Sequence, residues 1–307
     1  MNARRLHPEA ELPLVQVLVT DLDNTLWDWV HLWAHSMRRL LGTLSEQSGV
    51  PIAVLAAEAK SVHELRGTVE YSLLVDELPS LRGVIPASRR FDAAVHAQHS
   101  ARKQATGLYP GVAATLSRLK SSGVRLIAYS ESLEFWTERR IRRTGLDGVI
   151  DVLYTSDDHV VPDGFSFESV RTLPPDAYGL DFTEHRVVAK GLQKPNPDVL
   201  LRIIEETGVD RKNLAYVGDS RSKDVAMAQA AGVQDVWAAY GSSSDPADLE
   251  LLSALTHWTP EMIRDDHLAR ASAPSPTFVL KNGFDELTSL FRFEGRESAD
   301  GSHAASH

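Results

Sequence analysis

Two acidic residues directly follow a strongly apolar run near the start of the 307-residue chain, in the segment DLDNT at residues 21–25. A carboxylate at the end of a strand can attack phosphorus when a divalent cation offsets the repulsion between two anions, so Asp21 is a candidate nucleophile. Asp23 can protonate the leaving alcohol and then deprotonate the attacking water as a general acid–base group. Taken alone, the two acids are equally well explained as caps of the turn after a strand.

A serine and a lysine in similar positions can bind the phosphoryl group. Ser130 follows the apolar run LIAY, and its hydroxyl can hold a phosphoryl oxygen together with nearby backbone N–H groups. Lys194 precedes Pro195, which favours an extended lysine at the start of a helix. Its ammonium group can neutralise nucleophile and phosphate together. In isolation, a lone serine means little, and an ordinary surface position explains the lysine better.

A second acidic pair, Asp219 and Asp224, lies in the segment GDSRSKD between a predicted strand and a predicted helix. Two carboxylates around a strand-to-helix turn can face the same hard cation, which prefers oxygen ligands; Mg²⁺ fits this description. An acidic residue in the first turn of a helix also interacts favourably with the helix dipole, which is the alternative explanation of Asp224.

The elements that must position these residues follow a βαβ rhythm. The run LVQVLVT at residues 14–20 predicts a central strand buried on both faces. Further strands and helices are predicted to alternate after Pro110, with strands at 124–129, 149–154, 213–217 and 233–239 and helices at 111–121, 132–144, 197–207 and 221–231. The pattern predicts an α/β fold with a doubly wound, Rossmann-like parallel sheet, whose strand ends would gather the polar segments on one edge.

The chain is predicted to divide into a large core and a small lid. Residues 30–105 indicate successive helices and form the predicted α-helical cap domain, while residues 1–29 and 106–294 form the predicted core. Residues 157–185, rich in Asp, Pro and Gly, form an insertion of uncertain structure. The small, polar residues 295–307 are predicted to be a disordered tail.

Composition restricts the partners and the location. The 42 acidic and 32 basic residues give a net charge of −10, which favours neither nucleic acid nor anionic membranes as partners. The absence of cysteine excludes disulfides and thiolate chemistry. Met1 to Pro13 carries no apolar leader core, and no run of about 18 apolar residues occurs, so we expect a cytoplasmic protein. No residue pattern decides the oligomeric state.

Taken together and in order, DLDNT, the serine of LIAYSES, the lysine of QKPNPD and GDSRSKD resemble the four motifs of the haloacid dehalogenase (HAD) superfamily. The resemblance covers residues 14–239, and the helical block resembles the helical cap of the first type in that superfamily. It implies a catalytic pair, a phosphate-binding pair and a magnesium site, formed respectively by Asp21 and Asp23, by Ser130 and Lys194, and by Asp21, the Asp23 backbone carbonyl, Asp219 and Asp224.

The resemblance also implies an activity. We expect a Mg²⁺-dependent phosphohydrolase that acts on a small phosphorylated metabolite through an aspartyl-phosphate on Asp21. Members of the superfamily that cleave carbon–halogen bonds lack the second aspartate, so Asp23 favours phosphoryl transfer. A phosphomutase of a sugar phosphate and a non-catalytic regulatory protein that binds a phosphorylated metabolite stay open as alternatives. The long stretch between Ser130 and Lys194 also leaves open an extra element that shapes the substrate site, although a surface excursion explains it better.

Overall fold

A seven-stranded parallel sheet forms the centre of the molecule in the computed structural model, which describes residues 11–83, 85–158, 161, 178–189 and 192–295. Strand β2 lies in the middle of the sheet. All four of its residues are buried, because helices cover both faces of a central strand. The strand order is β5-β4-β3-β2-β6-β7-β8. In chain order the strands are β2 (Val17–Thr20), β3 (Arg125–Leu133), β4 (Val152–Ser156), β5 (Glu184–Val188), β6 (Leu214–Gly218), β7 (Gln234–Ala238) and β8 (Phe278–Leu280).

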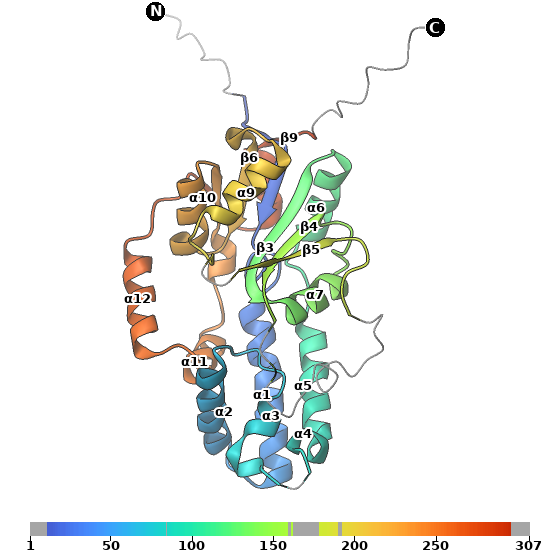
Figure 1. Cartoon of the computed structure of the whole chain (residues 1–307), viewed down its shortest axis with the longest axis vertical. Coiled ribbons are helices and arrows are strands. Elements are labelled where there is room, and N and C mark those ends of the chain that lie inside the picture. The colour runs from blue at the N-terminus through green and yellow to red at the C-terminus, as the bar shows by residue number, and fades with distance from the viewer. Residues whose placement is uncertain (1–10, 84, 159–160, 162–177, 190–191, 296–307) are drawn as a thin grey trace, which may run out of the picture.

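Helices cover both faces of this sheet, which confirms the predicted doubly wound α/β fold (Figure 1). Neighbouring residues of β2 point to opposite faces, so Leu18 and Val19 belong to two different hydrophobic clusters. The cluster of Leu18 includes side chains of α6 (Val112–Ser121), α7 (Glu134–Arg143) and α13 (Leu287–Leu290). The cluster of Val19 includes side chains of α9 (Asp198–Thr207) and α10 (Ala226–Ala231).

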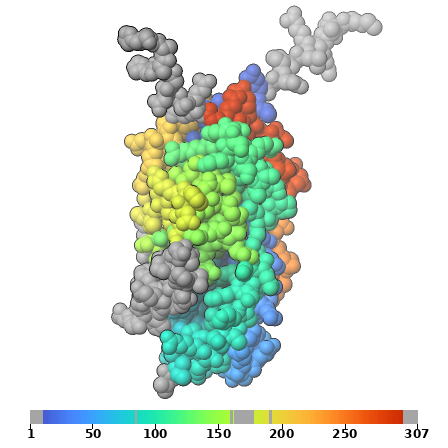
Figure 2. Space-filling model, turned by 90° about the vertical axis from the view of Figure 1, so that its right-hand side faces the viewer, coloured from blue at the N-terminus to red at the C-terminus, as the bar shows by residue number. Residues whose placement is uncertain are grey.

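A bundle of helices with its own hydrophobic cluster follows β2 in the chain. The helices extend from one end of the sheet, while β9, the last strand of the chain, lies at the other end (Figure 1). The view turned by 90° shows the same arrangement, with the blue and teal residues of the bundle below the green and yellow residues of the core (Figure 2). The bundle comprises α1 (Trp29–Ser48), α2 (Ile52–Arg66), α3 (Leu74–Glu77), the 3-10 turn η1 (Pro79–Leu81), α4 (Ala87–Arg90) and α5 (Asp92–Ala105).

Helix α11 (Pro246–Leu255) packs against this bundle although it follows the last central strand of the sheet in the chain. Its Leu255 is fully buried in the bundle's hydrophobic cluster. The carboxylate of Asp248 accepts a hydrogen bond from Arg38 and contacts His31, both on α1. Helix α12 (Pro260–Ala271) then leads the chain back toward β8 (Figure 1). The bundle of α1 to α5, called the cap below, is therefore attached to the core by a second segment. This segment contains α11 and lies within the range 106–294 that the sequence assigns to the core.

Several short elements were not predicted from the sequence. Edge strand β5 has the sequence EHRVV, whose charged residues differ from the apolar pattern of a buried parallel strand. The predicted strand 14–20 is interrupted at Gln16. Its first part, β1 (Leu14–Val15), pairs with β9 (Arg292–Phe293) outside the main sheet, and its second part is β2. Further 3-10 turns in the described part of the chain are η3 (Arg211–Asn213), η5 (Ala239–Ser242) and η6 (Phe284–Glu286).

Most of the predicted insertion at 157–185, and the predicted tail at 295–307 except for Gly295, lie outside the described residues. Within the described part of the chain, no helix combines the length and the apolar character that a membrane span requires.

We predict that His63 makes the protein sensitive to acid at the junction between the cap and α11. His63 is fully buried, Nδ1 lies 2.8 Å from the carbonyl oxygen of Leu255 and must carry the proton, and Nε2 has no hydrogen-bond partner. Burial lowers the pKa of His63 to about 4. Because the unfolded chain binds this proton more readily, stability is full above about pH 6.5 and is lost as the pH falls toward 4, by up to about 3 kcal/mol.

Urea unfolding across this pH range measures the effect. His63→Gln should show a flatter acid limb than the native protein, whereas the exposed control His96→Gln should keep the native slope. Equal slopes for His63→Gln and the native protein would contradict the prediction.

Candidate active site

The carboxyl ends of the central strands open into a cavity of about 1270 Å³ between the sheet and the cap. The motifs of Asp21, Lys194 and Asp219 follow strands β2, β5 and β6, and the serine motif lies within β3, near its carboxyl end. The structure brings all the predicted site residues to the wall of this cavity, namely Asp21, Asp23, Ser130, Lys194, Asp219 and Asp224.

Asp21 follows β2 and lies buried at the base of the cavity, with 6% of its surface exposed. Its Oδ2 accepts a hydrogen bond of 3.1 Å from the hydroxyl of Thr25, and its Oδ1 lies 2.5 Å from Nζ of Lys194. Burial raises the pKa of Asp21 to about 7; Lys194 opposes this shift and Asp224 adds to it. Both carboxylate oxygens are thus held in fixed directions at a position where negative charge is disfavoured.

Lys194 lies between two carboxylates. Its Nζ is 2.5 Å from Oδ1 of Asp21 and 2.8 Å from Oδ1 of Asp224. Burial lowers the pKa of Lys194, but the charges of Asp21 and Asp224 outweigh it and hold the pKa well above the ordinary value. The side chain is therefore a buried ammonium ion directed at the candidate nucleophile.

Asp224 is directed back toward the sheet by a π-helical turn, η4 (Arg221–Val225). Its Oδ1 accepts a hydrogen bond of 2.9 Å from the Tyr216 hydroxyl, and its Oδ2 accepts one of 2.9 Å from the Ser220 backbone N–H. A Cβ atom on Gly218 would lie 2.2 Å from Cγ of Asp224, so only glycine fits beside this carboxylate. Single π-helical turns of this kind are frequent at functional sites of proteins.

Carboxylate oxygens of Asp21, Asp219 and Asp224 lie within 4.8 Å of one another. Burial raises the pKa of Asp219 well above its ordinary value, and the charges of Asp21 and Asp224 raise it further. A cluster of hard oxygen donors with uncompensated repulsion fits a divalent cation such as Mg²⁺, which prefers such ligands and offsets their charge. The residues present therefore suit the metal that the sequence predicts.

Asp23 lies at the side of the cavity, two residues beyond Asp21. Its Oδ1 accepts a hydrogen bond of 2.6 Å from Nε1 of Trp27, and its Oδ2 accepts one from the hydroxyl of Ser132. Nε of Arg140 lies 3.7 Å from Oδ1. Two hydrogen-bond donors and one nearby cation thus orient this carboxylate, as a general acid–base group requires.

Ser130 is almost fully buried in β3, where its hydroxyl accepts a hydrogen bond of 3.1 Å from the backbone N–H of Ser132. Because the oxygen accepts this bond, its own hydrogen is free to point toward the cavity.

Other residues of the site were missed by the sequence analysis. Ser132, on the cavity wall, donates a hydrogen bond to Asp23, and the buried Tyr216 donates one to Asp224. In the sequence both are indistinguishable from other strand residues. The segment after β7 also contributes to the wall, through Leu252, Trp258, Ile263 and His267. The sequence showed no motif in this segment, because its position over the site depends on the packing of α11 against the cap.

The fold and the site together define a capped α/β enzyme with a buried carboxylate centre. Comparison with known proteins also indicates an enzyme, of the hydrolase class. A family model described as haloacid dehalogenase-like hydrolase matches residues 15–232, and a second, HAD-hydrolase-like model matches residues 191–280. The chain belongs to the haloacid dehalogenase-like hydrolases.

Two curated relatives match most of the chain. A glyceraldehyde 3-phosphate phosphatase of Methanopyrus kandleri is 22% identical, with 76% of this chain and 87% of that protein aligned. A phosphoglycolate phosphatase of Pseudomonas putida is 26% identical, with 82% of this chain and 77% of that protein aligned. Among solved structures, a 2-haloacid dehalogenase of Pseudomonas syringae pv. Tomato has a TM-score of 0.50 at 19% identity, covering 90% of this chain and 98% of that one, and shares the fold.

We predict that Asp219→Asn stabilises the metal-free protein. An acid whose pKa is raised by folding destabilises the folded state once the pH exceeds its unfolded pKa of about 3.9. The melting temperature of the metal-free variant should therefore exceed that of the native protein at pH 7.5, and the difference should vanish near pH 4. Added Mg²⁺ should stabilise the native protein more than the variant. Thermal unfolding with and without Mg²⁺ measures both effects.

The matched control is Asp265→Asn on the exposed surface of α12, which should leave both melting temperatures unchanged. A metal-free Asp219→Asn protein that melts below the native protein at pH 7.5 would contradict the prediction.

Proposed function

We propose that the protein is a Mg²⁺-dependent phosphohydrolase that cleaves a small phosphomonoester through an aspartyl-phosphate on Asp21. The observation that carries the proposal is the burial of Asp21 against Lys194, beside Asp219 and Asp224, with Asp23 on the wall of the same cavity. A nucleophile, a proton donor and a charge-neutralising centre thus face one space.

In the proposed first step, a carboxylate oxygen of Asp21 bonds to phosphorus while the bond from phosphorus to the leaving oxygen breaks. The leaving oxygen takes a proton from Asp23. In the second step, the Asp23 carboxylate takes a proton from water as the water oxygen bonds to phosphorus. The bond from phosphorus to Asp21 then breaks, which releases phosphate and restores both side chains.

Lys194 and Ser130 would bind the phosphoryl group in both steps. The ammonium ion of Lys194 reduces the repulsion between Asp21 and the incoming phosphate, and the hydroxyl of Ser130 can donate to a phosphoryl oxygen. Asp21, the backbone carbonyl of Asp23, Asp219 and Asp224 would hold the cation. A bound Mg²⁺ supplies charge neutralisation between the carboxylates and the phosphate.

The nature of Asp23 supports phosphoryl transfer rather than dehalogenation, because the departure of an alkoxide needs a proton donor. The names of the two curated relatives support the same choice and suggest short-chain phosphates as first candidates. Since the cavity exceeds the roughly 300–1,000 Å³ of typical ligand pockets, sugar phosphates and nucleotides belong in the test panel as well.

We predict that Asp21→Asn abolishes phosphate release, with a fall in kcat of roughly 10³-fold or more, because the amide cannot act as the nucleophile. The measurement is release of inorganic phosphate from p-nitrophenyl phosphate, phosphoglycolate, glyceraldehyde 3-phosphate and a wider panel. Chelation should remove the activity and Mg²⁺ should restore it. The exposed control Asp265→Asn should retain native rates.

The products distinguish the competing functions. An isomerised hexose phosphate without free phosphate would replace the hydrolase with a mutase. Binding of a phosphorylated compound without turnover of any substrate would replace it with a non-catalytic binding protein.

A further inference from the structure

Arg140 of helix α7 lies at the junction between the core and the cap, with one carboxylate from each side. Its Nε is 3.7 Å from Oδ1 of Asp23, the proposed acid–base group of the core. Its two terminal nitrogens donate to the two carboxylate oxygens of Glu70, over 2.7 and 3.2 Å. Glu70 belongs to the cap, in the loop between α2 and α3. Arg140 therefore links the catalytic centre to the lid through a bidentate ion pair.

The cap side of this link is tightly packed. Glu70 is 5% exposed, and its backbone carbonyl accepts a hydrogen bond of 2.6 Å from Nε1 of Trp136 on α7. Burial opposes ionisation of Glu70, but Arg140 and Arg102 outweigh it and lower the pKa of Glu70. The guanidinium of Arg102, on α5, lies 3.9 Å from the centre of the Trp136 ring. This Glu70 loop therefore contacts α7 through both backbone and side chain.

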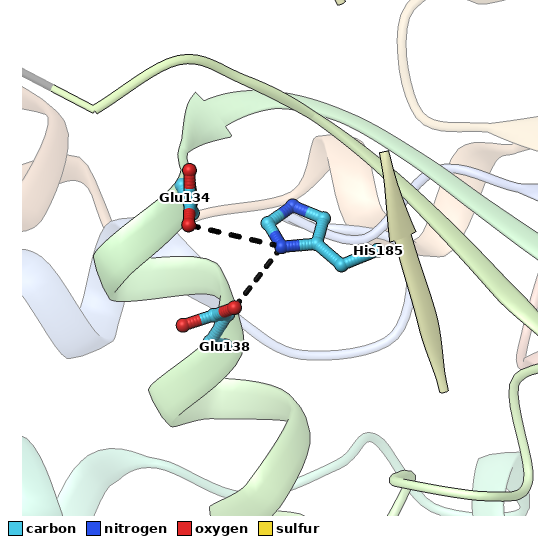
Figure 3. Close-up of side chains that lie close together, drawn as sticks. All are labelled: Glu134, Glu138 and His185. Carbon is cyan, nitrogen blue, oxygen red and sulfur yellow. Dashed lines mark hydrogen bonds and ion pairs between the residues drawn. The ribbon is translucent and has the colours of Figure 1, made fainter. Parts of the chain in front are cut away.

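The core side of the link is rigid because helix α7 is attached to the edge of the sheet. His185 of β5 lies between Glu134 and Glu138 of α7, with Nδ1 3.0 Å from Oε1 of Glu138 (Figure 3). The other ring nitrogen of His185 lies 2.7 Å from the hydroxyl of Thr155 on β4. Contacts with two strands therefore hold α7 against the sheet, so the backbone of Arg140 belongs to the core while that of Glu70 belongs to the cap.

The contact with Asp23 differs from the contact with Glu70. At 3.7 Å the Arg140 Nε is beyond hydrogen-bond range of Asp23, and it has no hydrogen-bond partner in the described structure. Arg140 thus hydrogen-bonds to Glu70 of the cap and acts on Asp23 through charge. This charge adds to the hydrogen bonds from Trp27 and Ser132 without occupying a further lone pair of the carboxylate, which can still bond with a leaving group.

We infer that Arg140 is a positioning residue that couples Asp23 to the cap through Glu70, so that Asp23 is oriented for proton transfer when the cap holds Glu70 against α7. The inference rests on the proposed acid–base role of Asp23. Its consequence is that the proton-transfer steps, more than attack by Asp21, depend on the junction between cap and core.

Leaving-group dependence tests this coupling. The phenolate released from p-nitrophenyl phosphate needs little protonation, whereas the alkoxide released from an alkyl phosphate needs a full proton. Arg140→Met should lower kcat for phosphoglycolate, or for the best alkyl phosphate of the panel, by roughly 10- to 100-fold. The first-turnover burst of p-nitrophenolate should stay within about twofold of the native rate constant. Asp23→Asn should show the same pattern more strongly, and Glu70→Gln should show it more weakly.

Two further variants separate positioning from structural support. Arg140→Met/Glu70→Met removes both buried charges together, which is often tolerated where removal of one is not. This double variant should fold and still discriminate against alkyl phosphates, because Asp23 lacks its cationic neighbour. Arg38→Met breaks a different ion pair of the cap, with Asp248 of α11, and should leave the ratio of the two rates unchanged.

Equal losses for both leaving groups in Arg140→Met, or a native ratio in the double variant, would overturn the inference. If Asp23→Asn discriminates between leaving groups and Arg140→Met does not, only the coupling fails. If Asp21→Asn keeps full activity, or if Asp23→Asn does not discriminate, the proposed function itself fails.

Discussion

The concentration of negative charge at the carboxyl ends of the central strands is the constraint on which the site depends. Asp21, Asp219 and Asp224 lie within 4.8 Å of one another; burial raises the pKa of Asp21 and of Asp219, and the charge of Asp224 raises both further. The buried ammonium ion of Lys194 contacts two of these three carboxylates. Such a cluster of buried oxygen donors suits a divalent cation, whose charge would offset the repulsion between the carboxylates.

A buried cation between two carboxylates, as at Lys194, is also found at the boundary between the core and the cap. Arg140 faces Asp23 on the core side and Glu70 on the cap side, and burial makes each of these groups dependent on its partner. The cap is held on its other side by α11, whose Asp248 contacts α1 and whose Leu255 is buried among cap residues. The lid is therefore tied to the core at two places, and one of them leads directly to the proposed proton donor.

Most of the fold, and the gathering of the candidate site residues around one cavity, could be predicted from the sequence. The apolar run before Asp21 and the regular alternation after Pro110 indicate a parallel sheet, because burial on both faces requires such runs. Since the strand ends of a parallel sheet meet on one edge, the four motifs were expected around a single cavity, where the structure places them. Short edge elements such as β5 escaped prediction, because strands exposed on one side lack that continuous apolar pattern.

Residue types and local spacing thus determined which side chains can do chemistry and on which edge of the sheet they lie. Only the tertiary structure decided their partners. The contact of Arg140 with Glu70 and Asp23, the hydrogen bond from Tyr216 to Asp224 and the packing of α11 on the cap join residues far apart in the chain or on different faces of an element. Such pairings depend on how whole helices and strands pack, and the local periodicity of a sequence carries no information about them.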